Sequence, residues 1–269
     1  MVPLTYEKRD AIARITFNRP EVRNAMDPET IVRLAEAWAD FAADVEMRVA
    51  IITGAGEAAF CAGADLGKLI PLFSGARPVE TEWDHRLLAN RGMISTALLK
   101  SEPPIYKPII AAVNGFCLAG GTELIQGTDI RIAAPHARFG LTEVSRGIIP
   151  AGGSLARLAR QIPYCKAMEI LLTGQHMTAD EAWRVGLINE VVPKEDLLRR
   201  AEEIAQVIAA NGPIAVSACK EAVIRSSGLS LTEAYAIEAE VSARVMRSED
   251  AREGPKAFME KRQPRFTGR

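Results

Sequence analysis

The sequence predicts an α/β fold followed by a helical region, and three observations support this. Short apolar runs such as "RVAIITGAG" (48–56) and "KPIIAAVNG" (107–115) predict buried strands, and each run ends in glycine. A glycine-rich turn and a helical pattern follow the second run and precede another strand, "DIRIAA" (129–134). After Pro193 the pattern becomes almost purely helical. The recurring order of strand, glycine loop and helix is compatible with stacked β-β-α turns or with an open α/β sheet.

Length and composition are those of an ordinary globular protein. The 269 residues are 48% hydrophobic and 25% charged, which is sufficient for a sizeable core. A net charge of −1 gives no reason to expect a nucleic-acid or anionic-membrane partner. No apolar run approaches the length of a membrane span, and the N-terminus lacks the pattern of a signal peptide. The four cysteines form no C-x-x-C pair, so we expect reduced core thiols and a cytoplasmic protein.

The N-terminal part predicts a hairpin and a capped helix. "LTYEKRDAIARITFNRP" alternates apolar and polar residues on both sides of Arg9-Asp10, which predicts two strands joined by a turn. Asp27 is an N-cap candidate, with Pro28 at the first helical position and apolar residues at helical spacing as far as Phe41.

The middle of the chain predicts a flap, two helices and a strand. Residues 67–85 are polar and irregular, with prolines and glycines, which predicts a mobile flap. A helix is expected over residues 83–100. Thr178 and Glu181 form a capping box, and Gly186 ends that helix before the strand "LINEVVP".

A helical region is expected from residue 197 onward. Apolar residues at helical spacing form one stripe along its first helix, and further helices follow to about Arg262. We therefore expect a boundary near residue 196, which divides a core of residues 1–196 from a helical region of residues 197–269. Because so short a region makes a poor independent core, it must pack on the core or on a neighbouring subunit.

The stretch "NGFCLAGGTELIQGTDI" (114–130) combines glycines at a helix start with a carboxylate one turn later. If the helix begins at Gly120, its unpaired N–H and the Glu123 side chain face the same small volume. Such an amide suits a developing oxyanion, and a carboxylate beside it suits proton transfer. The alternative is that Gly120 and Gly121 only permit close packing and that Glu123 is an ordinary first-turn charge.

Two further stretches favour the chemical interpretation. "FCAGADL" (60–66) is a second glycine turn after a strand, and we expect the amide of Ala62 to be a partner donor. "FGLTEVSRGIIPAGG" (139–153) places Glu143 between a strand and a helix. Two amides and two carboxylates suit the addition of water to an α,β-unsaturated thioester, because the amides stabilise the enolate and the acids move protons.

These motifs together resemble the crotonase (enoyl-CoA hydratase/isomerase) superfamily over nearly the whole chain. The resemblance implies a spiral of β-β-α turns with a C-terminal helical region for trimerisation, in a homotrimer or homohexamer. It implies an acyl group carried as a coenzyme A thioester, without a metal or redox cofactor. The motifs that carry it are "NRPEVRNAM" (18–26), "FCAGADL", "KPIIAAVNG", "GGTEL" (120–124), "ILLTG" (170–174) and "FMEKRQP" (258–264).

The resemblance implies a role for each candidate residue of the reaction. Ala62 and Gly120 are similar in position to the two oxyanion-hole amides. Glu123 matches the residue that orients and deprotonates water, and Glu143 matches the residue that delivers a proton to Cα. The implied activity is that of an enoyl-CoA hydratase, which forms a 3-hydroxyacyl-CoA from a trans-2-enoyl-CoA. An isomerase, a hydroxyacyl-CoA dehydratase and a non-catalytic acyl-CoA-binding member are the alternatives.

The resemblance also implies where coenzyme A lies. Arg23 would face the CoA phosphates, and the backbone of residues 64–66 would contact adenine and pantetheine. Phe258 and Lys261 would lie near adenine, in the site of an adjacent subunit. The alternatives are a surface role for Arg23 and Lys261, a core role for Phe258 and an N-cap at Asp65. The residues expected to bind coenzyme A are thus Arg23, Ala64, Asp65, Leu66, Phe258 and Lys261.

Three positions depart from the commonest pattern of the superfamily. Thr142 replaces a frequent proline, Arg146 stands where an apolar residue is usual, and Ala151 stands where glycine is common. We expect these residues to border the acyl pocket, so a simple short-chain substrate does not follow from the resemblance.

Other chemistries fit the sequence poorly. "IITGAGEAAF" contains a partial dinucleotide fingerprint, but a turn follows it instead of a long helix. No G-x-S-x-G motif of a serine hydrolase is present, and the three histidines lack the spacing of metal ligands.

Overall fold

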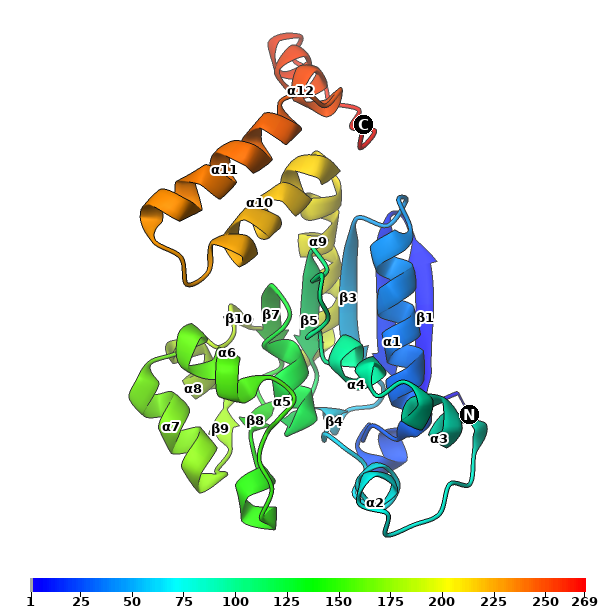
Figure 1. Ribbon diagram of the computed structural model, residues 1–269. Coiled ribbons are helices and arrows are strands. Elements are labelled where there is room, and N and C mark those ends of the chain that lie inside the picture. The colour runs from blue at the N-terminus through cyan, green and yellow to red at the C-terminus, as the bar shows by residue number, and fades with distance from the viewer. Residues whose placement is uncertain (1) are drawn as a thin grey trace.

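The computed structural model describes residues 2–269, which form two sheets surrounded by helices (Figure 1). The larger sheet has six strands in the order β1-β2-β3-β5-β7-β10. Its first two strands are antiparallel and the others pair in parallel. Its strands are β1 (Leu4–Arg9), β2 (Ile12–Phe17), β3 (Val49–Gly54), β5 (Ile109–Val113), β7 (Ile130–Ala133) and β10 (Glu190–Val191).

The smaller sheet consists of very short strands in the order β4-β6-β8-β9. Each central strand of the larger sheet is followed by one strand of the smaller sheet, so that β3 leads to β4, β5 to β6 and β7 to β8. The chain therefore winds as stacked β-β-α turns, and the predicted spiral is confirmed in preference to an open sheet. The strands are β4 (Ala59–Cys61), β6 (Phe116–Leu118), β8 (Arg138–Gly140) and β9 (Met177–Thr178).

Helices cover both sheets and make up the C-terminal region (Figure 1). Three short 3-10 helices connect longer elements: η1 (Pro20–Val22), η2 (Glu143–Arg146) and η3 (Lys194–Asp196). The α-helices are α1 (Pro28–Ala43), α2 (Leu69–Ser74), α3 (Glu82–Ala89), α4 (Gly92–Ala97), α5 (Gly120–Ile125), α6 (Ser154–Gln161), α7 (Tyr164–Thr173), α8 (Ala179–Arg184), α9 (Leu197–Ala209), α10 (Pro213–Ser226), α11 (Leu231–Val245) and α12 (Asp250–Met259).

The local signals of the sequence are confirmed where they involve neighbouring residues. The Asp27 side chain accepts a hydrogen bond from the Thr30 N–H and caps α1. Thr178 and Glu181 form the expected capping box at α8. Gly186, with φ of +79°, adopts the left-handed backbone conformation just beyond the end of this helix.

Two expectations for the local structure of the middle of the chain are corrected. The stretch expected to be irregular contains the helix α2, and within it Arg77 donates to both carboxylate oxygens of the buried Asp84 at 2.7 and 2.8 Å. The single helix expected over residues 83–100 is divided into α3 and α4, since Asn90 leaves the helical conformation with ψ of 81°.

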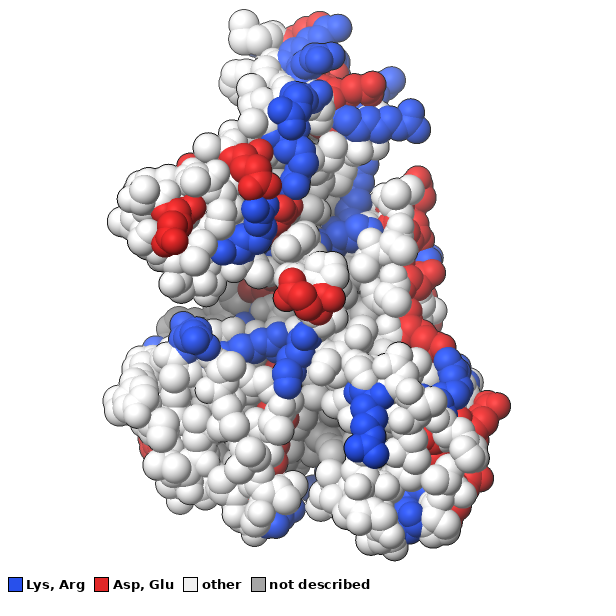
Figure 2. Space-filling view, in the orientation of Figure 1, with Lys and Arg blue, Asp and Glu red and all other residues white. Residues whose placement is uncertain are grey.

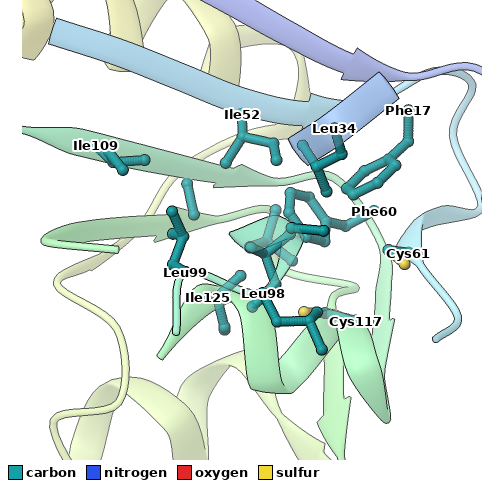
Figure 3. Close-up of a cluster of buried hydrophobic side chains, with 14 of the residues drawn as sticks. Phe17, Leu34, Ile52, Phe60, Cys61, Leu98, Leu99, Ile109, Cys117 and Ile125 are labelled. Carbon is teal, nitrogen blue, oxygen red and sulfur yellow. The ribbon is translucent and has the colours of Figure 1, made fainter. Parts of the chain in front are cut away.

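The core lies between the sheets and the helices that cover them. Figure 3 shows apolar side chains of the larger sheet, such as Phe17 and Ile52, packed with Phe60 of the smaller sheet and Leu34 of α1. Two cysteines, Cys61 and Cys117, are buried in this cluster, as expected. Cys165 and Cys219 are instead exposed on α7 and α10, so the expectation that all four thiols belong to the core is wrong.

The helices after residue 196 differ in what they contact. Helix α9 packs its apolar stripe against the larger sheet, in a second cluster with Ile51, Ile110 and Ile132. Helices α10 and α11 form a hairpin that extends away from the sheets (Figure 1). The helical region begins at Leu197, and the part of it that stands apart from the sheets begins after α9. Figure 2 shows charged side chains of both signs on this part.

No single helix within residues 2–269 is long and apolar enough to cross a membrane. The segments Lys194–Ala209 and Pro213–Ser226 reach that length and composition only together, with a bend of 103° between them.

Candidate active site

The glycines of the opening stretch form the sharp entry into α5. Ala119 precedes the helix with φ of 50° and ψ of −124°, which is a strained conformation for a residue with a side chain. A Cβ on Gly121 would lie 2.3 Å from the carbonyl oxygen of Cys61, so only glycine fits there. Gly120 is the first residue of α5, and its N–H has no acceptor within the helix. The N-terminus of α5 therefore offers an amide that has no acceptor among residues 2–269, as the sequence predicts.

The second amide is not the one expected from the sequence. The Ala62 N–H donates to the carbonyl of Arg23 at 3.0 Å and is already used. The Ala64 N–H has no acceptor among residues 2–269. Ala64 pairs with Met26 in a parallel bridge, but the two hydrogen bonds of this bridge are made by the Gly63 carbonyl and the Asp65 N–H. The Ala64 nitrogen lies 3.8 Å from the position of a Cβ on Gly120, beside the first amide. We therefore replace Ala62 by Ala64 as the candidate partner of Gly120.

Glu123 is held on the inner face of α5, and only 4% of its surface is exposed. Its Oε1 accepts a hydrogen bond of 3.3 Å from the Ser154 N–H at the start of α6. Burial raises the pKa of Glu123 above its ordinary value, and the amides of Ser154 and Gly152 oppose this. A Cβ on Gly152 would lie 2.4 Å from its Oε2, so Gly152 is required for the carboxylate to occupy this place.

Glu143 begins the short helix η2, and 7% of its surface is exposed. Its Oε2 is buried without a hydrogen-bond partner among residues 2–269. Burial, assisted by the negative charge of Glu123, raises the pKa of Glu143 to about 7. Glu143 can therefore carry a proton near neutral pH.

The two glutamates and the two amides face one cavity of about 600 Å³. Helices α2 and α4 supply apolar residues to its wall, including Leu69, Phe73 and Ile94. The three unusual positions of the sequence also line it. The polar, glycine-rich part of the lining is Ala62, Ala64, Gly120, Glu123, Thr142, Glu143, Arg146, Ala151 and Gly152.

The residues expected to bind coenzyme A separate into two groups. Arg23 lines the cavity with its guanidinium 5.4 Å from the centre of the Phe116 ring, and Leu66 also lines the cavity. The Asp65 side chain accepts hydrogen bonds from Gly67 and Lys68 and binds Arg19 at 3.0 Å, so it stabilises the turn. Its own N–H and carbonyl are also bonded within the chain, and its contact with coenzyme A stays a prediction.

Phe258 and Lys261 lie outside the cavity of their own chain. Phe258 is 81% exposed on α12, which excludes the alternative of a core residue. Lys261 follows the end of α12 with φ of 53°, and its N–H donates to the Phe258 carbonyl at 3.1 Å.

Sequence reasoning missed two side chains that shape the site. Asn24, with φ of 56°, is buried and donates to the carbonyls of Ala55 and Ala59 at 3.0 and 2.7 Å. Arg19 donates to the carbonyl of Ala25 at 2.6 Å and to Asp65. These bonds fix the loop that supplies Arg23, and the only sequence signal was a polar cluster inside "NRPEVRNAM". Within residues 2–269 no group of three or more His, Cys, Asp or Glu residues is arranged to hold a metal ion.

Comparisons of sequence and of structure with known proteins point to the same family. A sequence model described as enoyl-CoA hydratase/isomerase matches residues 7–269. Enoyl-CoA hydratase EchA19 of Mycobacterium tuberculosis is 43% identical over 263 residues, covering 98% of this chain and 96% of the relative. (E)-Benzylidenesuccinyl-CoA hydratase of Thauera aromatica is 37% identical over 272 residues, covering 99% and 100%. The crystal structure of enoyl-CoA hydratase EchA1 from Mycobacterium marinum superposes with a TM-score of 0.87 at 40% identity, covering all of both chains.

Proposed function

The chain belongs to the enoyl-CoA hydratase/isomerase family, and we propose that it reversibly adds water to a trans-2-enoyl-CoA to give a 3-hydroxyacyl-CoA. The observation that carries the proposal is the presence of two buried glutamates, Glu123 and Glu143, in one cavity with the free amides of Ala64 and Gly120. Burying two carboxylates costs free energy, and a protein that only binds acyl-CoA has no need of them.

The two amides would bind the thioester oxygen. As water adds to Cβ, negative charge develops on this oxygen in an enolate. The amides of Ala64 and Gly120 are fixed by the backbone, so they stabilise this charge without reorganising. Loss of one such donor typically lowers kcat by about 10²–10³-fold.

The two glutamates would move the protons. Glu123 accepts a proton from water as the water oxygen bonds to Cβ, and the protonated Glu143 donates its proton to Cα. The surroundings support this assignment, because burial raises the pKa of Glu143 to about 7, whereas the rise at Glu123 is opposed by two amides and by the charges of Lys100 and Arg157. The pair then exchanges a proton to return to its starting state. This chemistry requires no metal ion or redox cofactor.

Arg23 and Leu66 support a CoA-binding end of the cavity, because both line it and a guanidinium suits a phosphate. Thr142, Arg146 and Ala151 lie at the part of the cavity that borders Glu143. The relatives include hydratases of different acyl groups, as the name benzylidenesuccinyl-CoA hydratase shows for one of them. We therefore assign the class of thioester and not a particular acyl chain.

We also propose that the protein assembles as a trimer, or a trimer doubled into a hexamer, through α10–α12. These helices expose apolar side chains that a single chain leaves uncovered, including Val223, Leu231 and Tyr235. Phe258 and Lys261 would then contact coenzyme A in the cavity of an adjacent subunit. Closed symmetric assembly is the common solution for soluble oligomers.

A panel of thioesters tests the proposed reaction. Purified, chelator-treated protein is incubated with 2-enoyl-CoA, 3-enoyl-CoA and 3-hydroxyacyl-CoA substrates of several chain lengths. We expect water addition to the 2-enoyl-CoA and water loss from the 3-hydroxyacyl-CoA. Double-bond migration without water addition would favour the isomerase alternative, and binding without turnover would favour a non-catalytic member.

A further inference from the structure

Arg157 lies next to the candidate active site without lining its cavity. It is half-buried on α6, three residues after Ser154. Its Nη1 donates to the carbonyl of Leu98 at 3.2 Å and its Nη2 donates to the carbonyl of Leu99. Leu99 has a left-handed backbone with φ of 54°, which is unfavourable for a residue with a side chain. The guanidinium therefore stabilises a turn whose backbone conformation at Leu99 is unfavourable by itself.

This turn and the start of α6 both border Glu123. The Ser154 N–H at the start of α6 donates to Glu123 Oε1. From the turn, Leu98 Cδ1 lies 2.7 Å from the position of a Cβ on Gly152, the same position that lies 2.4 Å from Glu123 Oε2. Leu98 and Glu123 thus both pack against Gly152. A change at Arg157 would therefore move two neighbours of the Glu123 carboxylate, the Leu98–Leu99 turn and the start of α6.

Arg157 also acts on Glu123 through its charge. Burial lowers the pKa of Arg157, the negative charge of Glu123 opposes this, and the guanidinium stays charged at any working pH. The charges of Lys100 and Arg157 both lower the pKa of Glu123. At Glu143, the positive charge that lowers the pKa is that of Arg146. The positive charge around the pair is therefore greater on the Glu123 side.

Other charged groups lie near Arg157. Arg131 is buried and donates to the carbonyls of Leu187 and Thr128, at 2.9 and 3.1 Å. Arg157 also lines a second cavity of about 470 Å³, together with Arg160, Lys220 and Asp129. Lys220 forms an ion pair of 2.8 Å with Asp129 in that cavity. On the side of the active site, Lys100 donates to the carbonyl of Ala151 at 2.8 Å and lines the first cavity.

We propose that Arg157 is a positioning residue for the hydration: by holding the Leu98–Leu99 turn against α6 and by its charge, it keeps Glu123 in place and ionised. The proton shared by the pair then resides on Glu143. Water can lose a proton only to an ionised Glu123, and Cα can gain one only from a protonated Glu143. The opposite distribution of the proton is inactive for water addition.

The kinetic test rests on the proposed function and compares Arg157→Gln, Arg157→Lys and the matched control Arg160→Gln. Arg160 lies three residues further along α6, and its side chain donates a hydrogen bond to the carbonyl of Ala156 in its own helix. In Arg157→Gln the low-pH limb of kcat/KM should move up by about 0.5–1 pH unit, as expected for the loss of a nearby opposite charge. The kcat should fall roughly 10–100-fold with KM within about twofold, since a positioning defect acts on the chemical step.

The conservative variant separates charge from simple structural support. Arg157→Lys should return the low-pH limb to its wild-type position while kcat recovers only in part, and Arg160→Gln should match the wild type. A fall in kcat with an unmoved low-pH limb in Arg157→Gln would overturn the proposal. If Arg157→Gln does not fold, Arg157→Lys decides: a shifted limb in a variant that keeps the charge contradicts the proposal, and an unmoved limb with lowered kcat upholds it.

A second arm does not depend on activity. Carboxyl groups of 13C-labelled glutamate are titrated by NMR, with Glu123→Gln and Glu143→Gln used to assign the signals. We expect the wild-type signal that titrates near pH 7 to disappear in Glu143→Gln, and the Glu123 signal to titrate at higher pH in Arg157→Gln. If Glu123 is the protonated member in the wild type, the proposal is wrong. If the titrations agree but no thioester is hydrated, only the proposed function fails.

Discussion

The substitution Gly152→Ala tests whether the position of Glu123 controls turnover. The added Cβ would lie 2.4 Å from Glu123 Oε2 and 2.7 Å from its Cδ. Because an ordinary contact is about 3.4 Å, the carboxylate must move by about 1 Å. A displacement of about 1 Å at a reacting group can lower kcat by about 10²-fold, which corresponds to about 2.7 kcal/mol of transition-state stabilisation.

Steady-state kinetics on a 2-enoyl-CoA and thermal unfolding measure the two consequences separately. We expect kcat to fall roughly 100-fold with KM nearly unchanged, because the backbone amides that bind the thioester are untouched. The added methyl group should also destabilise the protein by about 1–3 kcal/mol, as overpacking usually does. Gly67→Ala is a matched control, since its Cβ would meet only the Asp65 carboxylate, at an ordinary 3.5 Å.

The outcome that contradicts this reasoning is a folded Gly152→Ala protein with wild-type kcat. It would mean that Glu123 has room to move without loss of function, and hence that its position is not critical for proton transfer. An equal fall in Gly67→Ala would instead show that the assay responds to general loosening of the structure.

Four other predictions follow from the same site. Glu123→Gln and Glu143→Gln should each lower kcat by roughly 10²–10⁴-fold, and the double variant should lose less than the product of the two, as kinetics of all three would show. The folded-state pKa of Glu143 is raised to about 7, so the proton on Glu143 contributes to stability. This contribution is fully present at pH values below the unfolded-state pKa and is lost as pH rises through 7. Glu143→Gln should therefore raise Tm relative to the wild type more at pH 8 than at pH 5, and an equal change at both pH values would contradict the assignment. Deleting residues 255–269 should raise KM for CoA thioesters and lower the mass measured by light scattering, while Tm of the core changes little. An unchanged KM and an unchanged mass would exclude a role of this segment in CoA binding and assembly. Arg146→Leu should change the ratio of kcat/KM between long and short acyl chains by at least about 10-fold, the effect of a changed pocket contact, whereas an unchanged ratio would remove Arg146 from the acyl pocket.

The pairing of an amide with a carboxylate at the start of α5 could be predicted from the sequence, because it depends on residues close together in the chain. A helix beginning at Gly120 necessarily brings its first amide and Glu123 to one face, and the structure has this arrangement. The caps of α1 and α8 follow from the same kind of local rule. The resemblance of the motifs to one superfamily then identified the fold without the structure.

The smaller sheet was not predicted. Strands β4, β6 and β8 contain three residues each, which is too short for an alternating pattern to stand out in the sequence. Their pairing comes from the stacking of successive β-β-α turns, which brings together segments far apart in the chain.

The identity of the second amide depended on tertiary structure alone. Ala62 and Ala64 both stand in the same glycine turn, and nothing in their spacing distinguishes them. The choice is made by the Arg23 carbonyl, which is supplied from a distant loop and takes the Ala62 N–H, leaving the Ala64 N–H free among the described residues. Arg157 is a similar case, because its partners are carbonyls about 60 residues earlier in the chain. Residue types and local spacing thus determined which groups the site contains. Long-range hydrogen bonds decided which amides are available, and burial in the folded chain raised the pKa of both glutamates.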